Sequence, residues 1–335
     1  MSLRIVSNTV VLKKAVRALT IDELMSRYEL SNRAAGKSEK TIGWYNEILI
    51  LFSRYLKENR FADDLSSINT DMAKRYILFL RNKPKFKGHP FTPRQSVTLS
   101  PQTLRCHTRA LKAFSTWLHV EEYTPENRLK NLKLPKATIR IIEPLTLAEI
   151  KQIIASIDKS LPTGVRNHTI FVLLLDTGLR ASEVAGITIK YLNLQDGFIR
   201  VMGKGAKERV VPIGNHVQSI LLNYINSVRP QPVDRECDKL FLSRNGKPIT
   251  VNTLKLVFTR LAKHSGVERL HAHLCRHTFS INYLLNGGDI FSLRAILGHT
   301  TLEMVNHYLH FTSSQITAQH HKFSPMDKLQ EQVPE

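Results

Sequence analysis

Apolar residues recur at helical spacing in both halves of the chain, and this periodicity restricts the fold to a mainly α-helical class. In the first half the pattern runs from residue 21 to about residue 60. Its apolar positions include Tyr45, Ile48, Leu49, Phe52, Tyr55 and Leu56. Further helices are expected at about 71–81 and 101–119, the second opened by the N-cap residue Ser100 and by Pro101 at the first helical position. The first half is therefore predicted to be a small all-α unit.

The second half shows one break in the helical pattern. Strand-like runs, Phe198–Met202 and Glu208–Ile213, flank the basic turn Gly203-Lys204-Gly205-Ala206-Lys207 and predict a β-hairpin. The other patterned segments are helical, at about residues 146–158, 165–177, 215–227, 250–264, 273–285, 290–297 and 301–310. The predicted fold class is therefore mainly α with a small antiparallel β-sheet.

A proline-containing basic segment separates the two halves. Residues 132–144 hold two prolines, three basic residues and no clear periodicity, which is typical of an interdomain linker. The expected order is an N-terminal extension (1–20), a helical domain (21–131), the linker (132–144), a second domain (145–312) and a C-terminal tail (313–335). The sparse apolar residues of the tail favour docking on another surface, and the alternative is a disordered end or one folded back on its own domain.

The positive charge is concentrated in the first half. The 335 residues include 48 Lys and Arg against 28 Asp and Glu, a net charge of +20. Residues 1–140 hold 26 of the basic and 12 of the acidic residues, a net charge of +14. A protein this basic usually has a polyanionic partner, most often nucleic acid, although such charge can also serve solubility alone. The first half is predicted to grip phosphate backbone.

The cysteines and the hydropathy of the chain indicate the cellular compartment in which the protein is expected. Three cysteines far apart, Cys106, Cys237 and Cys275, do not form a disulfide framework, which fits a reduced, cytoplasmic setting. No run reaches the roughly 18 apolar residues of a membrane span. No membrane partner is therefore expected.

The second half carries a set of residues suited to phosphodiester chemistry. Arg180 follows the glycine that ends an apolar helix, and Glu183 lies three residues on, where it can orient the guanidinium. His273 and Arg276 share one helical face, and His299 precedes Tyr308 by nine residues. Cations and a phenol in this set suggest a phosphodiester held by arginines and attacked by tyrosine. Taken singly, a surface ion pair and a half-buried core tyrosine are the ordinary alternatives.

Two basic segments allow more than one interpretation. Glycines flank Lys204, so its turn can move and deliver a proton to a leaving alkoxide; a solvated turn charge is the alternative. For Lys207 and Arg209, solvated charge and DNA contact are equally compatible with the sequence. His273 and His277 are spaced to share a metal, but Leu274 replaces the glutamate of a His-Glu-x-x-His site, so a zinc site is not favoured.

These segments together resemble the tyrosine recombinases of the phage-integrase family, especially bacterial Xer-like recombinases and transposon integrases. The segments that carry the resemblance are Asp176 to Glu183, Gly203 to Arg209, His273 to Phe279 and Leu297 to Tyr308. They span most of residues 145–312, and residues 20–130 resemble the helical core-binding domain of the family. The implied architecture is this helical domain plus an α/β catalytic domain. The stretch Met304 to His307 and a long loop at 82–100 depart from the family pattern.

The resemblance implies a mechanism and partners. Tyr308 would attack a DNA phosphate and leave a 3′-phosphotyrosyl link and a free 5′-hydroxyl. The remaining roles are implied for Arg180 and Arg276 (charge stabilisation), Glu183 (support of Arg180), Lys204 (general acid), His273 (proton transfer) and His299 (a phosphate oxygen or the tyrosine). No metal, nucleotide or other cofactor is implied.

The implied assembly is a homotetramer on double-stranded DNA with inverted-repeat sites, formed from a monomer or weak oligomer. Accessory DNA-bending or directionality proteins and a place at the bacterial nucleoid are further implications, as is a tail that passes between subunits. Two alternatives stay open: a type IB topoisomerase that relaxes DNA with a similar residue set, and a non-catalytic DNA-binding accessory protein of the same fold.

Overall fold

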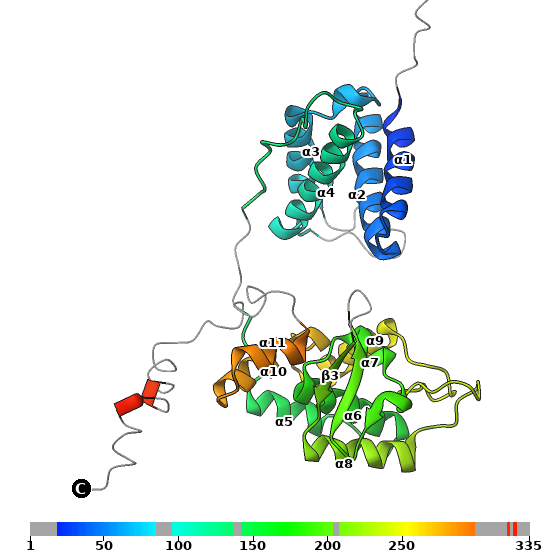
Figure 1. Ribbon diagram of the computed structural model, residues 1–335, viewed down its shortest axis with the longest axis vertical. Helices are drawn as coiled ribbons and strands as arrows, with labels where there is room; N and C mark the ends of the chain where they lie inside the picture. Colours follow the sequence, from blue (N-terminus) through cyan, green and yellow to red (C-terminus); the bar gives the residue numbers. More distant parts are fainter. Residues whose placement is uncertain are drawn as a thin grey trace, which may run out of the picture. The chain divides into compact units, whose positions relative to one another are not determined.

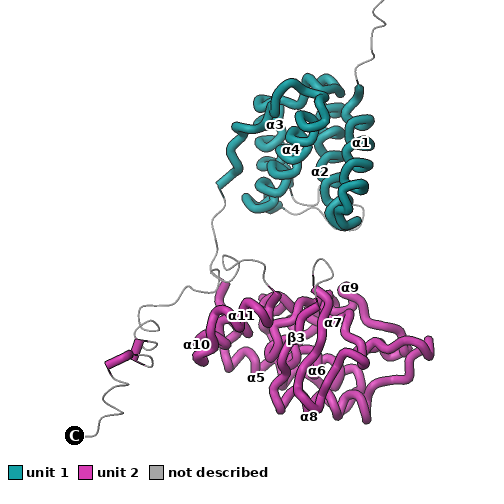
Figure 2. Tube along the Cα trace, viewed as in Figure 1, with its two compact units in different colours: residues 1–140 teal, residues 141–335 magenta. Residues whose placement is uncertain are grey.

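The chain divides into two compact units, residues 1–140 and residues 141–335 (Figure 2). In this computed structural model the described residues are 19–84, 96–136, 142–203, 208–298, 320–321 and 324–326. Within these ranges no helix is long and apolar enough to cross a lipid bilayer. The predicted helix at 301–310 and nearly all of the predicted tail lie outside the described residues.

The regular elements in the described part of unit 1 are helices (Figure 1). Its helices are α1 (Ile21–Ala34), α2 (Glu39–Glu58), α3 (Thr70–Asn82) and α4 (Pro101–Val120), with a 3₁₀ turn at Leu65–Ser67. Thr20 and Glu23 form a capping box at the start of α1. Gly36, with φ of 68°, and the N-cap Ser38 divide the patterned stretch 21–60 into two helices. Local sequence signals therefore set the helix ends.

Aromatic side chains dominate the core of unit 1. Tyr28 packs against Phe114 and Trp117, with ring centroids 5.3 and 5.1 Å apart, and Phe52 packs against Tyr76 at 5.1 Å. Burial of each such ring contributes about 1.5–3 kcal/mol, which favours a single packed arrangement of the four helices. The polar residues buried with them are neutral, and none of the Lys, Arg, Asp and Glu residues in the described part of unit 1 is fully buried.

Unit 2 combines helices with one small sheet. Its helices are α5 (Leu147–Ala155), α6 (Pro162–Thr177), α7 (Ala181–Gly186), α8 (Asn215–Asn223), α9 (Val251–Ser265), α10 (Ala272–Leu285) and α11 (Ile290–Leu297). A 3₁₀ turn at Ile189–Tyr191 precedes the strands, and a π-helical turn at Tyr224–Val228 follows α8. Strands β1 (Leu192–Asn193), β2 (Phe198–Met202) and β3 (Glu208–Pro212) form an antiparallel sheet in the order β1-β2-β3.

The fold class predicted from the sequence is confirmed, with local differences. The hairpin pairs Met202 with Glu208 and Val201 with Arg209, as the strand-like runs predicted. Helix α7 and strand β1 were not anticipated, because six and two residues are too short to show a period. Helix α6 begins at Pro162, three residues before the predicted start, since proline fits the first helical position.

Helix α6 packs against later helices of unit 2. This helix contacts α10 and α8, while α11 contacts both β3 and α10. Phe171 and Leu174 of α6 are buried in the same apolar core as Val211 of β3. The end of α6, the middle of β3 and the end of α11 are thereby brought together.

Candidate active site

The turn after α6 places Arg180. Gly178 has φ of 61°, a left-handed conformation that favours glycine. A Cβ atom at this position would lie 2.4 Å from Phe279 Cδ1 and 2.9 Å from Leu297 Cδ2, so space also requires glycine. The turn buries Leu179 and leaves Arg180 as the N-cap residue of α7, with 35% of its side chain exposed. Arg180 is thus held at the surface of the core by a rigid turn.

Glu183 is a buried carboxylate that receives hydrogen bonds from two arginines. Its Oε2 accepts from the backbone N–H of Arg180 at 2.8 Å, and its Oε1 accepts from Arg180 Nη1 at 2.9 Å. Arg209 of β3 donates from Nη1 to Oε1 at 2.8 Å and from Nη2 to Oε2 at 2.9 Å. Burial raises the pKa of Glu183, but the bonds from Arg209 and Arg180 outweigh burial and leave this pKa lowered. The carboxylate therefore stays ionised and is hydrogen-bonded to Arg180.

Arg276 lies on α10 beneath the same turn. Its side chain is among the largest that are fully buried, with only 1% of the residue exposed. Its Nη1 donates to the carbonyl of Gly178 at 2.7 Å, and its Nη2 donates to the carbonyl of Leu297 at 2.9 Å. Arg276 thus joins the end of α6 to the end of α11, and the structure brings it together with Arg180 and Glu183.

His273 lies one helical turn before Arg276. Its side chain reaches solvent. Partial desolvation, followed by the positive charges of Arg276, His271, His277 and Arg180, lowers its pKa. The imidazole is therefore neutral at neutral pH and can accept a proton beside the arginines.

His277 occupies a different environment on the same helix. It is buried, and its Nε2 lies 2.5 Å from the carbonyl oxygen of Ile142 at the start of unit 2. This contact fits the structural role predicted for His277. Among the described residues, no group of three His, Cys, Asp or Glu side chains could hold a metal ion.

Three predicted site residues, Lys204, His299 and Tyr308, lie outside the described residues. The described chain places their neighbours: Lys204 follows β2 by two residues, and His299 directly follows Gly298, the C-cap of α11. Both β3 and the end of α11 contact the cluster of Arg180, Glu183 and Arg276 through the bonds above. The assignment of these three residues therefore remains a prediction from the sequence.

Arg209 is the residue that sequence reasoning missed. Its side chain is only 12% exposed and is bonded to Glu183, so it is neither a solvated turn charge nor open for DNA. A signal for this was present: Arg209 and Val211 are two apart on β3 and face the same side, and Val211 is fully buried. The side chain of Arg209 therefore faces the core, as the alternation along the strand indicates.

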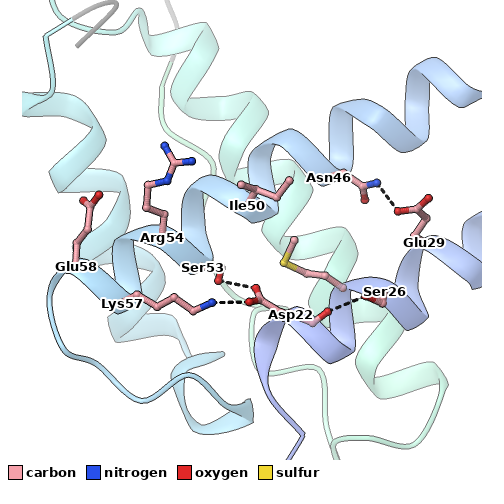
Figure 3. A pocket seen from close by; sticks show the side chains of 10 residues that line it. Asp22, Ser26, Glu29, Asn46, Ile50, Ser53, Arg54, Lys57 and Glu58 are labelled. Atoms are coloured by element: carbon pink, nitrogen blue, oxygen red, sulfur yellow. Dashed lines mark hydrogen bonds and ion pairs between the residues drawn. The ribbon is translucent and has the colours of Figure 1, made fainter. Parts of the chain in front are cut away.

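A polar groove in unit 1 offers a contrast. It lies between α1 and α2, where Ser53 donates to Asp22 at 2.8 Å and Asn46 donates to Glu29 at 2.7 Å (Figure 3). Lys57 forms an ion pair with the same carboxylate of Asp22. Both carboxylates are engaged by these neighbours, and the groove shows no cluster of arginines. It does not resemble a site for phosphodiester chemistry.

Comparison with known proteins identifies the family. The model of the phage integrase family matches residues 143–315, which is more than half of the chain. The chain belongs to the phage integrase family. The Xer-like tyrosine recombinase type predicted from the motifs is confirmed.

Relatives and solved structures agree with this assignment. Tyrosine recombinase XerD of Listeria innocua serovar 6a is 28% identical over 294 residues, covering 87% of this chain and 94% of the relative. XerD of Staphylococcus aureus strain N315 is 28% identical over 292 residues, with the same coverage.

Two of the similar solved structures have the same fold. The Tn1549 transposon integrase in complex with circular intermediate DNA has a TM-score of 0.68 at 24% identity, covering 91% of this chain and all of that one. XerH recombinase bound to palindromic difH substrate has a TM-score of 0.67 at 21% identity, with 91% and 85% covered. At these identities the likeness concerns the fold.

Proposed function

We propose that this protein is a site-specific DNA recombinase that cuts and rejoins strands through a covalent 3′-phosphotyrosyl intermediate. The observation that carries the proposal is the cluster of Arg180, Glu183 and Arg276, built by three distant segments of a phage integrase family chain. The XerD relatives are named as tyrosine recombinases, and XerH is described as a site-specific recombinase bound to its substrate. These names favour recombination over DNA relaxation and over a non-catalytic accessory role.

The two arginines stabilise the negative charge that develops on the phosphate. Among the described residues Arg180 donates one side-chain bond, from Nη1 to Glu183, and its exposed part faces solvent. Arg180 then contacts the non-bridging phosphate oxygens, and Arg276 adds positive charge from beneath. Cations fixed before the reaction need no reorganisation as charge develops, which is the main source of rate in such sites.

Proton transfer is divided among the other residues. Tyr308 is the nucleophile and attacks phosphorus, and Lys204 protonates the leaving 5′-oxygen. His273 assists as a neutral base, which its lowered pKa favours. His299 holds a phosphate oxygen or the tyrosine. The phosphotyrosyl bond retains the energy of the broken phosphodiester, so attack by a 5′-hydroxyl reverses the step.

The proposed assembly uses both units. Residues 21–131 act as the core-binding domain on DNA, residues 145–312 act as the catalytic domain, and 132–144 connect them. The +14 net charge of residues 1–140 supports a clamp on the phosphate backbone. We place the protein in the cytoplasm, as a tetramer on inverted-repeat sites, with accessory proteins that bend DNA or set directionality.

Substitution of Tyr308 by Phe tests the function. The substrate is a nicked suicide duplex built on a site that the full-length protein selects from a random library. Wild-type protein should form an adduct that survives a denaturing gel, whereas Tyr308→Phe should bind the duplex and form none, because it lacks the attacking oxygen. Undiminished adduct from the variant would assign the nucleophile elsewhere.

Deletion of residues 316–335 tests the assembly. If the tail joins neighbouring subunits, the truncated protein should bind a single site almost normally and lose cooperative binding and strand exchange between paired sites. The measurements are a gel-shift titration and a recombination assay. Recombination of paired sites at the full-length rate would show that the tail has no coupling role.

A further inference from the structure

We infer that Arg209 positions the phosphate-binding arginines, by neutralising Glu183 so that Arg180 keeps its charge for DNA and by tying this pair to the end of α11. Arg209 would not touch the substrate itself, because its side chain is 12% exposed and its guanidinium is bonded on three nitrogens. The inference rests on the proposed function.

The hydrogen bonds of Glu183 indicate how Arg209 keeps Arg180 available for DNA. Arg209 takes both carboxylate oxygens with parallel bonds of 2.8 and 2.9 Å, the fork geometry that arginine and carboxylate prefer. Arg180 shares Oε1 and makes a single side-chain bond of 2.9 Å. Without Arg209, both oxygens would be open to Arg180, whose own fork would then pair with Glu183 and turn away from the phosphate.

The count of charges around Glu183 also indicates that Arg209 leaves Arg180 free to act on the phosphate. Arg180, Arg209 and Arg276 carry three positive charges around the single negative charge of Glu183. Two positive charges therefore remain for an incoming phosphate. Removal of Arg209 leaves one, and it leaves a buried carboxylate with Arg180 as its remaining cationic hydrogen-bond partner among the described residues. A fixed cation counts for more here than in water because the surroundings are partly desolvated.

Arg209 also ties the pair of Glu183 and Arg180 to the end of α11. Arg209 Nε donates to the carbonyl of Ile296 at 2.8 Å, and Arg276 Nη2 donates to the next carbonyl, that of Leu297, at 2.9 Å. These are carbonyls of the last helical turn, which lack partners within the helix. The two arginines thus cap the same helix end from different elements.

Gly298 shows how closely Arg209 packs at this end. Gly298 has φ of 63°, and a Cβ atom there would lie 3.0 Å from Arg209 Cδ and 3.1 Å from its Nε and Nη1. The next residue in the chain is His299, and Lys204 lies five residues before Arg209 on the same hairpin. Arg209 is therefore bonded to Glu183 and to the end of α11, and it is close in sequence to Lys204. It links the segments that supply Arg180, Lys204 and His299.

The rate of adduct formation on two substrates shows whether Arg209 positions the phosphate-binding arginines or only stabilises the fold. The variant is Arg209→Met, and the matched control is Arg229→Met, whose guanidinium also donates to backbone carbonyls, those of Leu240 and Lys239. One suicide duplex carries the ordinary scissile phosphate, and the other carries an uncharged methylphosphonate there. A displacement of about 1 Å can cost about 100-fold in rate, so Arg209→Met should lose about that on phosphate.

On methylphosphonate the loss should be below about tenfold, because less negative charge needs stabilising. The Arg229→Met control should form adduct at nearly the wild-type rate on both substrates. An equal loss for Arg209→Met on both substrates, or no loss on either, would overturn the inference. A wild-type protein that forms no adduct would contradict the proposed function itself, and the inference with it.

A double-mutant cycle with Glu183→Gln keeps the test decisive if Arg209→Met folds poorly. Glutamine removes the buried negative charge, so adding Arg209→Met to it should cost far less rate than in the wild-type background. Arg209→Lys keeps a charge near Glu183 but cannot reach three acceptors at once, and it should fold and still lose rate on phosphate. Full activity of Arg209→Lys, or additive losses in the cycle, would show that the geometry of Arg209 has no positioning role.

Discussion

The two units of this protein treat charge in opposite ways. Unit 1 carries most of the positive charge, yet its buried polar residues in the described part are neutral, such as Asn32 and His107. Unit 2 has the smaller net charge of +6, but it buries Arg166, Glu183 and Arg276. Unit 1 keeps its charge where a polyanion can reach it, whereas unit 2 fixes charge inside the fold.

In the proposed function this difference separates binding from chemistry. Surface lysines and arginines attract a phosphate backbone through long-range, salt-dependent interactions that need little precision. A reacting phosphate needs cations at fixed positions, and burial with hydrogen-bonded partners provides this at a cost in desolvation. Variants that act on one unit and spare the other can break this contrast.

Lys204→Ala should slow strand cleavage by about 10²–10⁴-fold, the usual contribution of a general acid. The loss should largely disappear on a duplex with a 5′-bridging phosphorothiolate, whose leaving group needs no proton. Arg276→Ala should not be rescued, because the role proposed for Arg276 is to stabilise charge on phosphorus and not to protonate the leaving group. Equal defects of Lys204→Ala on both duplexes would move the acid role to another residue, with His273 the next candidate.

Binding to a selected duplex should weaken by about 10³-fold or more between about 50 and 200 mM salt if six or more phosphates are neutralised. Lys40, Lys74 and Arg109 are exposed on three helices of unit 1. Changing all three to Gln should lower the salt slope more than the same change at the exposed Lys151, Lys247 and Lys255 of unit 2. Equal slopes for both triple variants would contradict the division of roles.

Arg276→Met should destabilise unit 2 by about 2–4 kcal/mol, because the carbonyls of Gly178 and Leu297 would lose their donors while buried. Arg54→Met, at an exposed position of unit 1, should change stability by less than about 0.5 kcal/mol. Urea unfolding of the full chain, followed by probes in each unit, measures both. Comparable losses would remove the distinction between buried and surface arginines.

Unit 1 should lose stability in mild acid through His107. Burial, and to a lesser extent the charge of Lys83, lowers the pKa of His107 to about 4 from an ordinary value of 6.5. The unfolded chain then binds the proton more readily, so stability is full above pH 6.5 and falls as pH drops towards 4. The loss at pH 5 is about 2 kcal/mol.

His107→Gln provides the comparison for this acid effect. It should flatten the profile of unit 1 between about pH 6.5 and pH 4, because glutamine does not titrate. An unchanged profile would mean that the ring of His107 gains its proton without cost in the folded state.

Much of this protein was predictable from local sequence. The helix starts at Thr20, Ser100 and Thr146 carry capping residues, and the hairpin around Lys204 is marked by alternation and glycines. These signals involve only a few neighbouring residues, so they can be recognised without knowledge of the fold. The family was also predictable from the motifs, and the family model matches the stretch, residues 143–315, that carries them.

Only the tertiary structure decided which distant residues form hydrogen bonds around the proposed site. Glu183 meets Arg209 across 26 residues, Arg209 meets Ile296 across 87, and Arg276 meets Gly178 across 98. Such pairs form only when α6, β3, α10 and α11 pack around one core, and no local period encodes them. The alternation along β3 indicates that Arg209 faces the core, but the packing of distant segments decides which partners it meets there.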